Sequence, residues 1–419
     1  MSVLVHVLST IDRSLLYRVA LFYFGFYPIF MALVWVILSI SYYRRREVKP
    51  EAAPDDYAPF ISIVIPSFAE EETIARTIEA LLALDYPDYE VIVVTDGSPD
   101  VTPEIVQLYF DSPRVRLLEK RVNEGKAMAL NDALPLCRGE IIVMVDADIV
   151  ATPSLLSDLC KHFNSPRVAA VTGNPRVENL SSLLRQLQAI EFSSIVSVQR
   201  RAQRVWGRVL TVSGAVVALR RTALLDVGLF APDMATEDIE ITWRLQRKFW
   251  DVRYESAAVV WMQVPGTLVE LWKQRRRWAR GLAQVLKRHW DVPLHWKQRR
   301  LWPIYFEAIF SILWAHTFSL LTTYWIVAMF AGYRPYGLSP FPNLWGMIIA
   351  TACLAQIFTG MMMDRRYDPA IVRLVPIAIF YPLIYWTLMS TITTIYTLPA
   401  LIRRGPRMQT WQIKREEMP

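Results

Sequence analysis

The sequence is poor in two residue types that often build metal and hydrolytic sites. Its 419 residues include only 3 cysteines and 5 histidines. The cysteines are odd in number and lack the paired spacing of metal ligands, so we interpret Cys137, Cys160 and Cys353 as inert core thiols. The histidines are scattered along the chain, so they suggest neither a zinc site nor a Ser-His-Asp triad. These scarcities exclude most classes of hydrolase.

Positive charge, by contrast, exceeds negative charge, and the formal net charge is +7. Basic patches can neutralise the phosphates of nucleic acids. The arginines of this chain, however, gather at the borders of apolar segments and on one helix. That distribution fits an anionic lipid face and a nucleotide diphosphate better. We therefore expect a lipid bilayer, and no nucleic acid, among the partners.

Long apolar runs are abundant, and the chain is 53% hydrophobic with 15 tryptophans. The first run, residues 18–43, follows an N-terminal segment (1–17) and has no charge between Val19 and Tyr43. It exceeds the roughly 20 residues that a membrane-spanning helix needs. A cleaved signal peptide is the competing interpretation, but no small-x-small cleavage site closes the run. The sequence therefore predicts a transmembrane helix over 18–43.

The charges beside the apolar runs predict which side of the membrane each part occupies. Three arginines, 44–46, follow the first run, and the positive-inside rule places them in the cytosol. The expected order after the first helix is a linker (44–57), a cytosolic catalytic domain (58–266), amphipathic interfacial helices (267–300), a C-terminal membrane region (301–402) and a basic tail (403–419).

The C-terminal membrane region holds three apolar stretches, at about 302–331, 344–363 and 374–402. Three simple crossings would place the basic tail outside, against the positive-inside rule. Two interpretations stay open. In the first, one stretch is interfacial or re-entrant, as Pro376 and Pro382 in the last stretch and Glu307 in the first suggest. In the second, the basic tail is an exception to the positive-inside rule.

The expected cytosolic domain alternates strands and helices. Residues 60–66 and 89–95 are β-branched strand patterns, and an acidic helix start at 70–72 lies between them. A third strand, 141–145, ends in Asp146-Ala147-Asp148. In open α/β sheets ligands bind beyond the carboxyl ends of strands. This pattern predicts a nucleotide-binding α/β domain.

Six short motifs follow one another in a fixed order: Pro66 with Glu70, Asp96-Gly97-Ser98, Asn123-x-Gly125-Lys126-Ala127, Asp146-Ala147-Asp148, Thr236-Glu237-Asp238 and Gln274-x-x-Arg277-Trp278. The set resembles the processive family 2 glycosyltransferases, which include cellulose, chitin and hyaluronan synthases. The stretches 171–176, 211–214 and 271–275 are similar to bacterial poly-β-1,6-N-acetylglucosamine synthases of biofilm exopolysaccharide systems. The resemblance covers most of the chain.

The resemblance implies a GT-A type domain, a mixed sheet flanked by helices, inserted between transmembrane helices. It implies an inverting, processive enzyme of the bacterial inner membrane that polymerises UDP-N-acetylglucosamine and moves the growing polysaccharide outward. A small membrane partner subunit and a response to cyclic di-GMP are further implications. The alternatives are a chitin, hyaluronan or cellulose type of synthase, a single-addition lipid glycosyltransferase, and a transporter with a nucleotide-sensing domain.

By resemblance, each motif residue also receives a role. The expected catalytic base is Asp238; the nucleotide-sugar ligands are Pro66, Glu70, Asp96, Lys126, Asp146 and Arg277; the acceptor ligands are Ser213, Gly214, Glu237, Gln274 and Trp278. The chain departs from the family pattern at Ala69, where most relatives have asparagine. A surface lysine is the alternative interpretation of Lys126.

Asp146 and Asp148 suit a divalent cation, Mg²⁺ or Mn²⁺, because hard carboxylate oxygens hold the ion that neutralises a departing diphosphate. Alternation along an extended strand end would place both on one side, with Asp148 on the metal and Asp146 on the metal or the ribose. A solvated Asp-Ala-Asp turn is the competing interpretation.

Asp238 suits the role of general base in an inverting transfer, because such a transfer needs one carboxylate to act on the acceptor hydroxyl. Acids also favour helix starts, so 236–238 could instead cap the helix that follows, and the two roles are compatible.

Residues 268–290 form an amphipathic helical pattern that favours the membrane interface. Gln274, Arg277 and Trp278 share one face, where arginine could hold the diphosphate and tryptophan could stack on the acceptor sugar. An interfacial anchor is the alternative role of Trp278. We expect Arg275, Arg276 and Arg280 to contact lipid phosphates.

Overall fold

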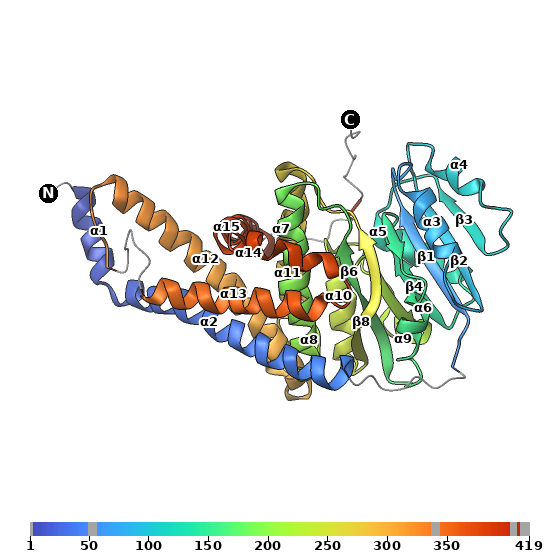
Figure 1. Cartoon of the computed structure of the whole chain (residues 1–419), viewed down its shortest axis with the longest axis horizontal. Coiled ribbons are helices and arrows are strands. Elements are labelled where there is room, and N and C mark those ends of the chain that lie inside the picture. The colour runs from blue at the N-terminus through green and yellow to red at the C-terminus, as the bar shows by residue number, and fades with distance from the viewer. Residues whose placement is uncertain (1–2, 49–56, 337–343, 403–408, 411–419) are drawn as a thin grey trace.

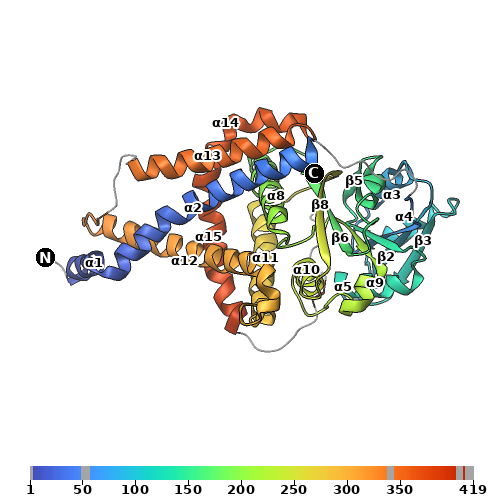
Figure 2. The ribbon, with the colours of Figure 1, turned by 90° about the horizontal axis from the view of Figure 1, so that it is seen from below.

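The computed structural model describes residues 3–48, 57–336, 344–402 and 409–410. An elongated set of apolar helices forms one end of the molecule and a mixed sheet forms the other (Figure 1). The helices α7, α8, α10 and α11 lie between these two ends in both views (Figures 1 and 2). The expected linker lies outside the described residues from 49 to 56, and most of the basic tail does as well.

Eight strands form one sheet in the order β3-β2-β1-β4-β7-β6-β8-β5. Strands β1 to β4 are mutually parallel, whereas β7 runs antiparallel to both β4 and β6. The strands are β1 (Ile61–Ser67), β2 (Tyr89–Asp96), β3 (Val115–Lys120), β4 (Ile141–Val145), β5 (Ile149–Ala151), β6 (Val168–Val177), β7 (Val216–Arg220) and β8 (Asp251–Met262). The expected mixed sheet flanked by helices is therefore confirmed.

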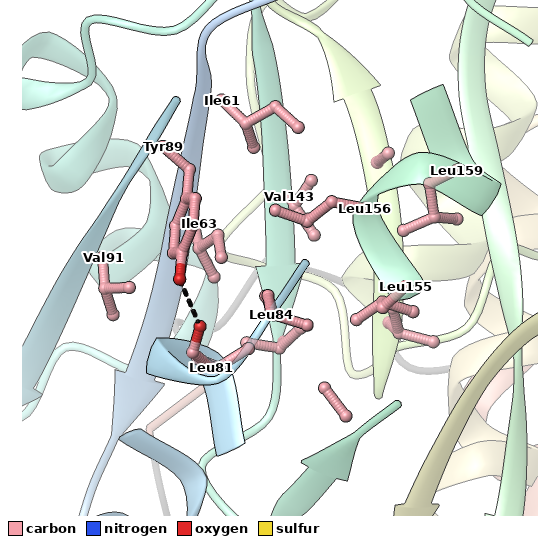
Figure 3. Close-up of a cluster of buried hydrophobic side chains, with 14 of the residues drawn as sticks. Ile61, Ile63, Leu81, Leu84, Tyr89, Val91, Val143, Leu155, Leu156 and Leu159 are labelled. Carbon is pink, nitrogen blue, oxygen red and sulfur yellow. Dashed lines mark hydrogen bonds between the residues drawn. The ribbon is translucent and has the colours of Figure 1, made fainter. Parts of the chain in front are cut away.

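The central strands are buried on both faces because their apolar side chains alternate between two cores. Ile61, Ile63 and Ile65 of β1 face one core, and Val64 faces the other. Figure 3 shows the first core, where the Tyr89 hydroxyl donates a hydrogen bond of 2.9 Å to the Leu81 carbonyl. The helices around the sheet are α3 (Ile74–Leu82), α4 (Thr102–Gln107), α5 (Lys126–Ala133), α6 (Leu155–Cys160), α9 (Arg221–Val227) and α10 (Glu237–Arg247).

A second set of helices joins the sheet to the apolar end of the molecule: α7 (Leu183–Glu191), α8 (Ser197–Trp206) and α11 (Leu268–Arg288). The helix α11 begins with a capping box, a pattern of residues that can be recognised in the sequence. The Thr267 hydroxyl accepts from the backbone N–H of Glu270, whose carboxylate accepts from the backbone N–H of Thr267.

The apolar end contains α1 (Val3–Arg13), α2 (Leu15–Tyr42), α12 (Trp302–Phe330), α13 (Leu344–Asp364), α14 (Val375–Ala378) and α15 (Tyr381–Ile402). Three segments of the described chain are helical, long and apolar enough to cross a membrane: Leu15–Glu47, Trp296–Phe330 and Gly346–Asp364. The expected stretch 374–402 is interrupted between Ala378 and Tyr381. Pro382 explains the break, because proline donates no hydrogen bond and clashes with the carbonyl four residues earlier.

The last helix, α15, packs against both α11 and α12. Trp272 of α11 donates to the Tyr396 hydroxyl at 3.2 Å, and the Thr394 hydroxyl lies 3.0 Å from the Ser319 hydroxyl of α12. The Tyr385 hydroxyl donates to Glu191 of α7 at 2.6 Å. This helix therefore joins α7 and α11, next to the sheet, to the apolar helix α12.

A buried ionic network fastens the apolar helices to the sheet. Arg201 of α8 donates to Glu47, just beyond α2, at 2.6 Å and to Asp364, at the end of α13, at 2.8 Å. Arg176 of β6 forms a second ion pair with Asp364. Removing one partner from such a pair leaves a buried charge uncompensated, so the network defines how the domain sits on the helices.

The loop after β1 contains a strained residue. Ala69 has φ 55°, and its N–H donates to the Ser98 hydroxyl at 2.8 Å. This left-handed conformation costs an ordinary L-residue about 1–2 kcal/mol, whereas asparagine tolerates it. The conformation gives a physical reason for the asparagine that the family pattern has here.

We expect Ala69→Asn to raise the free energy of unfolding by about 0.5–1 kcal/mol, which corresponds to a rise in Tm of about 2 °C. A thermal unfolding curve of the solubilised protein measures this change. Ala83→Asn is the matched control, since Ala83 is exposed and has φ −88°. Equal shifts in the two variants would contradict strain at Ala69.

Candidate active site

The carboxyl ends of the parallel strands β1, β2 and β4 meet at one edge of the sheet. Asp96 ends β2, and Asp146 directly follows β4. The first turn of α10 and the loop before β7 join this edge, because Gly214 lies next to both Lys126 and Asp238. The sequence motifs thus converge although they are far apart along the chain.

Lys126, the first residue of α5, lies at the centre of this convergence. Its ammonium nitrogen is 2.5 Å from Asp146 Oδ1 and 3.2 Å from the Gly214 carbonyl oxygen. Glu237 Oε1 lies 3.8 Å away. Because the Lys126 side chain is only 16% exposed and is ion-paired, the surface-lysine interpretation is wrong.

Burial by itself would lower the pKa of Lys126. The negative charges of Asp146, Glu237 and Asp238 outweigh it and hold this pKa above its ordinary value. The ammonium therefore stays charged at neutral pH and can bind a phosphate oxygen.

Asp146 directly follows β4, and Ala147 and Asp148 form a turn, so the expectation of an extended strand end through Asp148 is wrong. Ala147 points into the core, and both aspartates are partly exposed. The Thr77 hydroxyl donates to the Ala147 carbonyl at 2.8 Å and fixes the turn. The ion pair with Lys126 also argues against a merely solvated turn.

The donor set at this turn fits a divalent cation bound together with a substrate. Within the described parts of the chain, no group of three or more acidic, histidine or cysteine side chains could enclose an ion. Mg²⁺ commonly takes one or two carboxylates and completes its shell with water and substrate phosphates. Asp146 and Asp148 supply such a pair.

Asp238 lies in the first turn of α10, and its Oδ1 accepts from the Ile239 N–H at 2.9 Å. Burial, with the neighbouring Glu237 charge, raises the pKa of Asp238 to about 6, although Lys126 and Arg277 oppose the rise. The Thr236 side chain makes no capping hydrogen bond. Asp238 contacts the start of the helix through Oδ1, and its second oxygen, Oδ2, faces Gly214.

Gly214 keeps the space between Lys126 and Asp238 open. A Cβ atom at this position would lie 3.4 Å from Lys126 Nζ and 3.5 Å from Asp238 Oδ2. The preceding residue, Ser213, is held by its N–H, which donates to the Thr172 hydroxyl at 2.7 Å.

Asp96 lies behind the site rather than on its surface. Its buried carboxylate accepts from the N–H groups of Glu124 and Gly125 at 3.1 and 2.6 Å and pairs with Lys120 at 3.1 Å. In this way Asp96 positions the loop that leads into Lys126.

The first motif lies at the same edge of the sheet. Pro66 is buried within β1, and Glu70 follows the strand. The Glu70 carboxylate accepts from the Thr73 hydroxyl at 2.7 Å. The backbone N–H of Glu70 donates to the Thr102 hydroxyl at 3.0 Å.

The α11 motif borders the site near the start of α10. Arg277 is exposed and donates to the Ala235 carbonyl at 3.4 Å, close to the Glu237-Asp238 turn. Gln274 and Trp278 lie on the same helix and are partly exposed.

The expectation that Arg275 contacts lipid is wrong. Its side chain is fully buried, pairs with Glu191 at 2.5 Å and covers the Trp278 ring at 3.9 Å. The packing of α7 and α15 onto α11 encloses this residue.

Two features of this region were not found by sequence reasoning. Glu191 is a lone acid in an otherwise uncharged segment, 186–199, and that pattern was an available signal for a buried ion pair. The second feature is Gln409, whose N–H donates to the Pro232 carbonyl at 3.0 Å. A Cβ atom on Gly125 would come within 1.8 Å of the Gln409 carbonyl oxygen.

Comparisons with known proteins agree with this geometry. Residues 58–281 match the family described as "Glycosyltransferase like family 2". The chain is 33% identical over 399 residues to a poly-β-1,6-N-acetyl-D-glucosamine synthase of Staphylococcus epidermidis, covering 92% of this chain and 96% of that protein. The synthase of Staphylococcus aureus strain COL is also 33% identical, over 404 residues, with the same shares of both chains covered.

A solved structure shares the fold. A mannosyltransferase from Pyrobaculum calidifontis, in complex with GDP-Man and Mn²⁺, aligns with a TM-score of 0.62 and 21% identity, covering 90% of this chain and 99% of that one. The sheet, the converging motifs and the full-length relatives lead to one assignment: the chain is a glycosyltransferase that belongs to family 2, with a GT-A type domain.

Proposed function

We propose that this glycosyltransferase is an inverting, processive synthase that polymerises N-acetylglucosamine from UDP-N-acetylglucosamine into poly-β-1,6-N-acetylglucosamine. The observation that carries the proposal is the 33% identity to synthases of this polymer across 92% of the chain. The convergence of Lys126, Asp146 and Asp238 supports the proposal, because the site combines a buried carboxylate that can act as a base with groups that can bind a diphosphate.

In the proposed reaction, Asp238 accepts the proton of the acceptor hydroxyl while that oxygen forms a bond to the anomeric carbon of the donor sugar. The bond from this carbon to the diphosphate breaks on the opposite face, so the configuration inverts. Lys126 and Arg277 stabilise the charge of the departing UDP. A divalent cation on Asp146 and Asp148 would supply further charge neutralisation.

We also propose the membrane arrangement. Segments Leu15–Glu47, Trp296–Phe330 and Gly346–Asp364 cross the bacterial inner membrane, and α15 lies on the cytosolic side with the catalytic domain. Gln409, which follows α15, contacts Pro232 of that domain, so this arrangement keeps the tail in the cytosol. It agrees with the positive-inside rule. Synthesis would then be coupled to passage of the polymer between these helices.

Regulation belongs to the same proposal. By family resemblance, we propose a small membrane partner subunit through which cyclic di-GMP acts.

We expect membranes carrying the chain and its candidate partner to incorporate label from UDP-N-acetylglucosamine, but not from UDP-glucose or UDP-glucuronate, into polymer cut by a β-1,6-specific glucosaminidase. Asp238→Asn should lower the rate by about 100- to 10,000-fold, because general base catalysis contributes that much. Label found only in the lipid extract, or in a chitinase-sensitive product, would contradict the proposal.

The rate of polymerisation should fall on the acid side of about pH 6, because Asp238 acts only when deprotonated and its pKa is raised to about 6. Glu237→Gln removes a charge that raises this pKa, so the acid limb of the pH-rate profile should move to lower pH. Profiles of kcat/KM for the two proteins measure the shift. An unmoved limb would contradict the assignment of Asp238 as the titrating base.

Chelation by EDTA should abolish synthesis, and added Mg²⁺ or Mn²⁺ should restore it. Asp148→Asn should raise the metal concentration for half-maximal rate by more than about tenfold, since it removes one carboxylate ligand. Asp158→Asn is the control, because Asp158 lies on α6 and pairs with Lys161, the residue that follows this helix. An unchanged metal requirement in Asp148→Asn would exclude Asp148 as a ligand.

A further inference from the structure

Two neighbouring buried arginines of α8 have different surroundings. Arg201 is neutralised by Glu47 and Asp364. Arg200 is only 7% exposed, and across the described chain no carboxylate lies within ion-pair distance of it. Its Nη1 donates to the Gly173 carbonyl at 3.3 Å, and its Nε has no hydrogen-bond partner.

Such an arrangement is unfavourable for the protein alone. Burial of a guanidinium without a counter-ion is unfavourable, and buried charges are therefore usually paired. Burial lowers the pKa of Arg200 to about 10, against the opposing effects of Tyr254 and Asp238. Among the described residues, the guanidinium thus makes one hydrogen bond, to Gly173, and its Cζ lies 6.0 Å from the centroid of the Tyr254 ring.

The position of Arg200 relates it to the active site. Its partner Gly173 follows Thr172, which holds the N–H of Ser213 at 2.7 Å. The next residue, Gly214, borders Asp238. Asp238 is also close enough for its charge to act on Arg200. Arg200 therefore lies next to the segment that holds the loop bordering the expected acceptor position.

We propose that Arg200 is an acceptor-contacting residue whose guanidinium donates a hydrogen bond to an oxygen of the terminal sugar of the growing chain. This inference rests on the proposed function, because it presumes an acceptor sugar beside Asp238. A hydroxyl or an acetamido carbonyl oxygen is the matching chemistry. The bond is strong because the donor is charged and already desolvated.

Arg208 provides a matched control. It is 6% exposed, donates to the Gly207 carbonyl at 2.8 Å and also has an Nε without a partner. Its electrostatic neighbours are Asp251, Arg300 and Arg204, whereas Asp238 acts on Arg200. A general effect of removing a buried guanidinium should therefore appear when either Arg200 or Arg208 is replaced. An effect on use of the acceptor should appear only when Arg200 is replaced.

The experiment uses the full-length chain in membranes with labelled UDP-N-acetylglucosamine and short β-1,6-linked N-acetylglucosamine oligosaccharides as acceptors. For Arg200→Met, kcat/KM for the acceptor should fall about 10- to 100-fold, while the dissociation constant of UDP stays within about twofold. Arg200→Lys should recover part of the loss because it keeps a charged donor. Arg208→Met should keep its acceptor kcat/KM within about threefold.

An unchanged acceptor kcat/KM in Arg200→Met would overturn the inference. So would equal losses of acceptor use and UDP binding in Arg200→Met and Arg208→Met, because those losses indicate a structural role. If the wild-type chain polymerises a different sugar, the proposed function fails. The same comparison with oligosaccharides of that sugar then still decides the role of Arg200.

Discussion

The active site depends on one ammonium group that holds several carboxylates together. Asp146 and Glu237 both lie within 4 Å of Lys126, and Gly214 brings Asp238 next to the same lysine. Without this cation, the convergence of like charges in a partly buried site would be strongly unfavourable. The same cation also opposes the rise of the Asp238 pKa, so the proposed base keeps a pKa of about 6. The balance of charge around Lys126 thus links the proposed diphosphate-binding region to the proposed base.

The membrane end of the molecule is connected to this site by buried ions rather than by apolar packing alone. Arg201 joins the end of α2 to the end of α13, and Arg275 joins α11 to α7 through Glu191. Because each removed partner would leave a buried charge, these pairs favour one arrangement of domain and helices. Arg200, the neighbour of Arg201 on α8, has no such carboxylate partner in the described chain, and the proposed acceptor would supply its missing contact.

The sequence was sufficient for most features that depend on local pattern, although it missed the turn at Ala147 and Asp148. Apolar runs predicted the helices, because length and composition alone decide whether a segment can cross a bilayer. Strand patterns placed Asp96 and Asp146 at strand ends, since burial on both faces requires continuous apolar runs. The ordered motifs indicated the family, which the full-length relatives confirm.

The tertiary structure decided which charges are buried and which are paired. Arg275, Arg276 and Arg277 are adjacent in the sequence, yet Arg275 is fully buried and Arg277 is exposed. Periodicity gives the face of a helix but does not reveal that α7 and α15 cover it, because those contacts join residues far apart in the chain. For the same reason, Asp96 is a buried support of the Lys126 loop. The sequence by itself determined the segments and their chemistry, and long-range packing determined the surroundings of each charge.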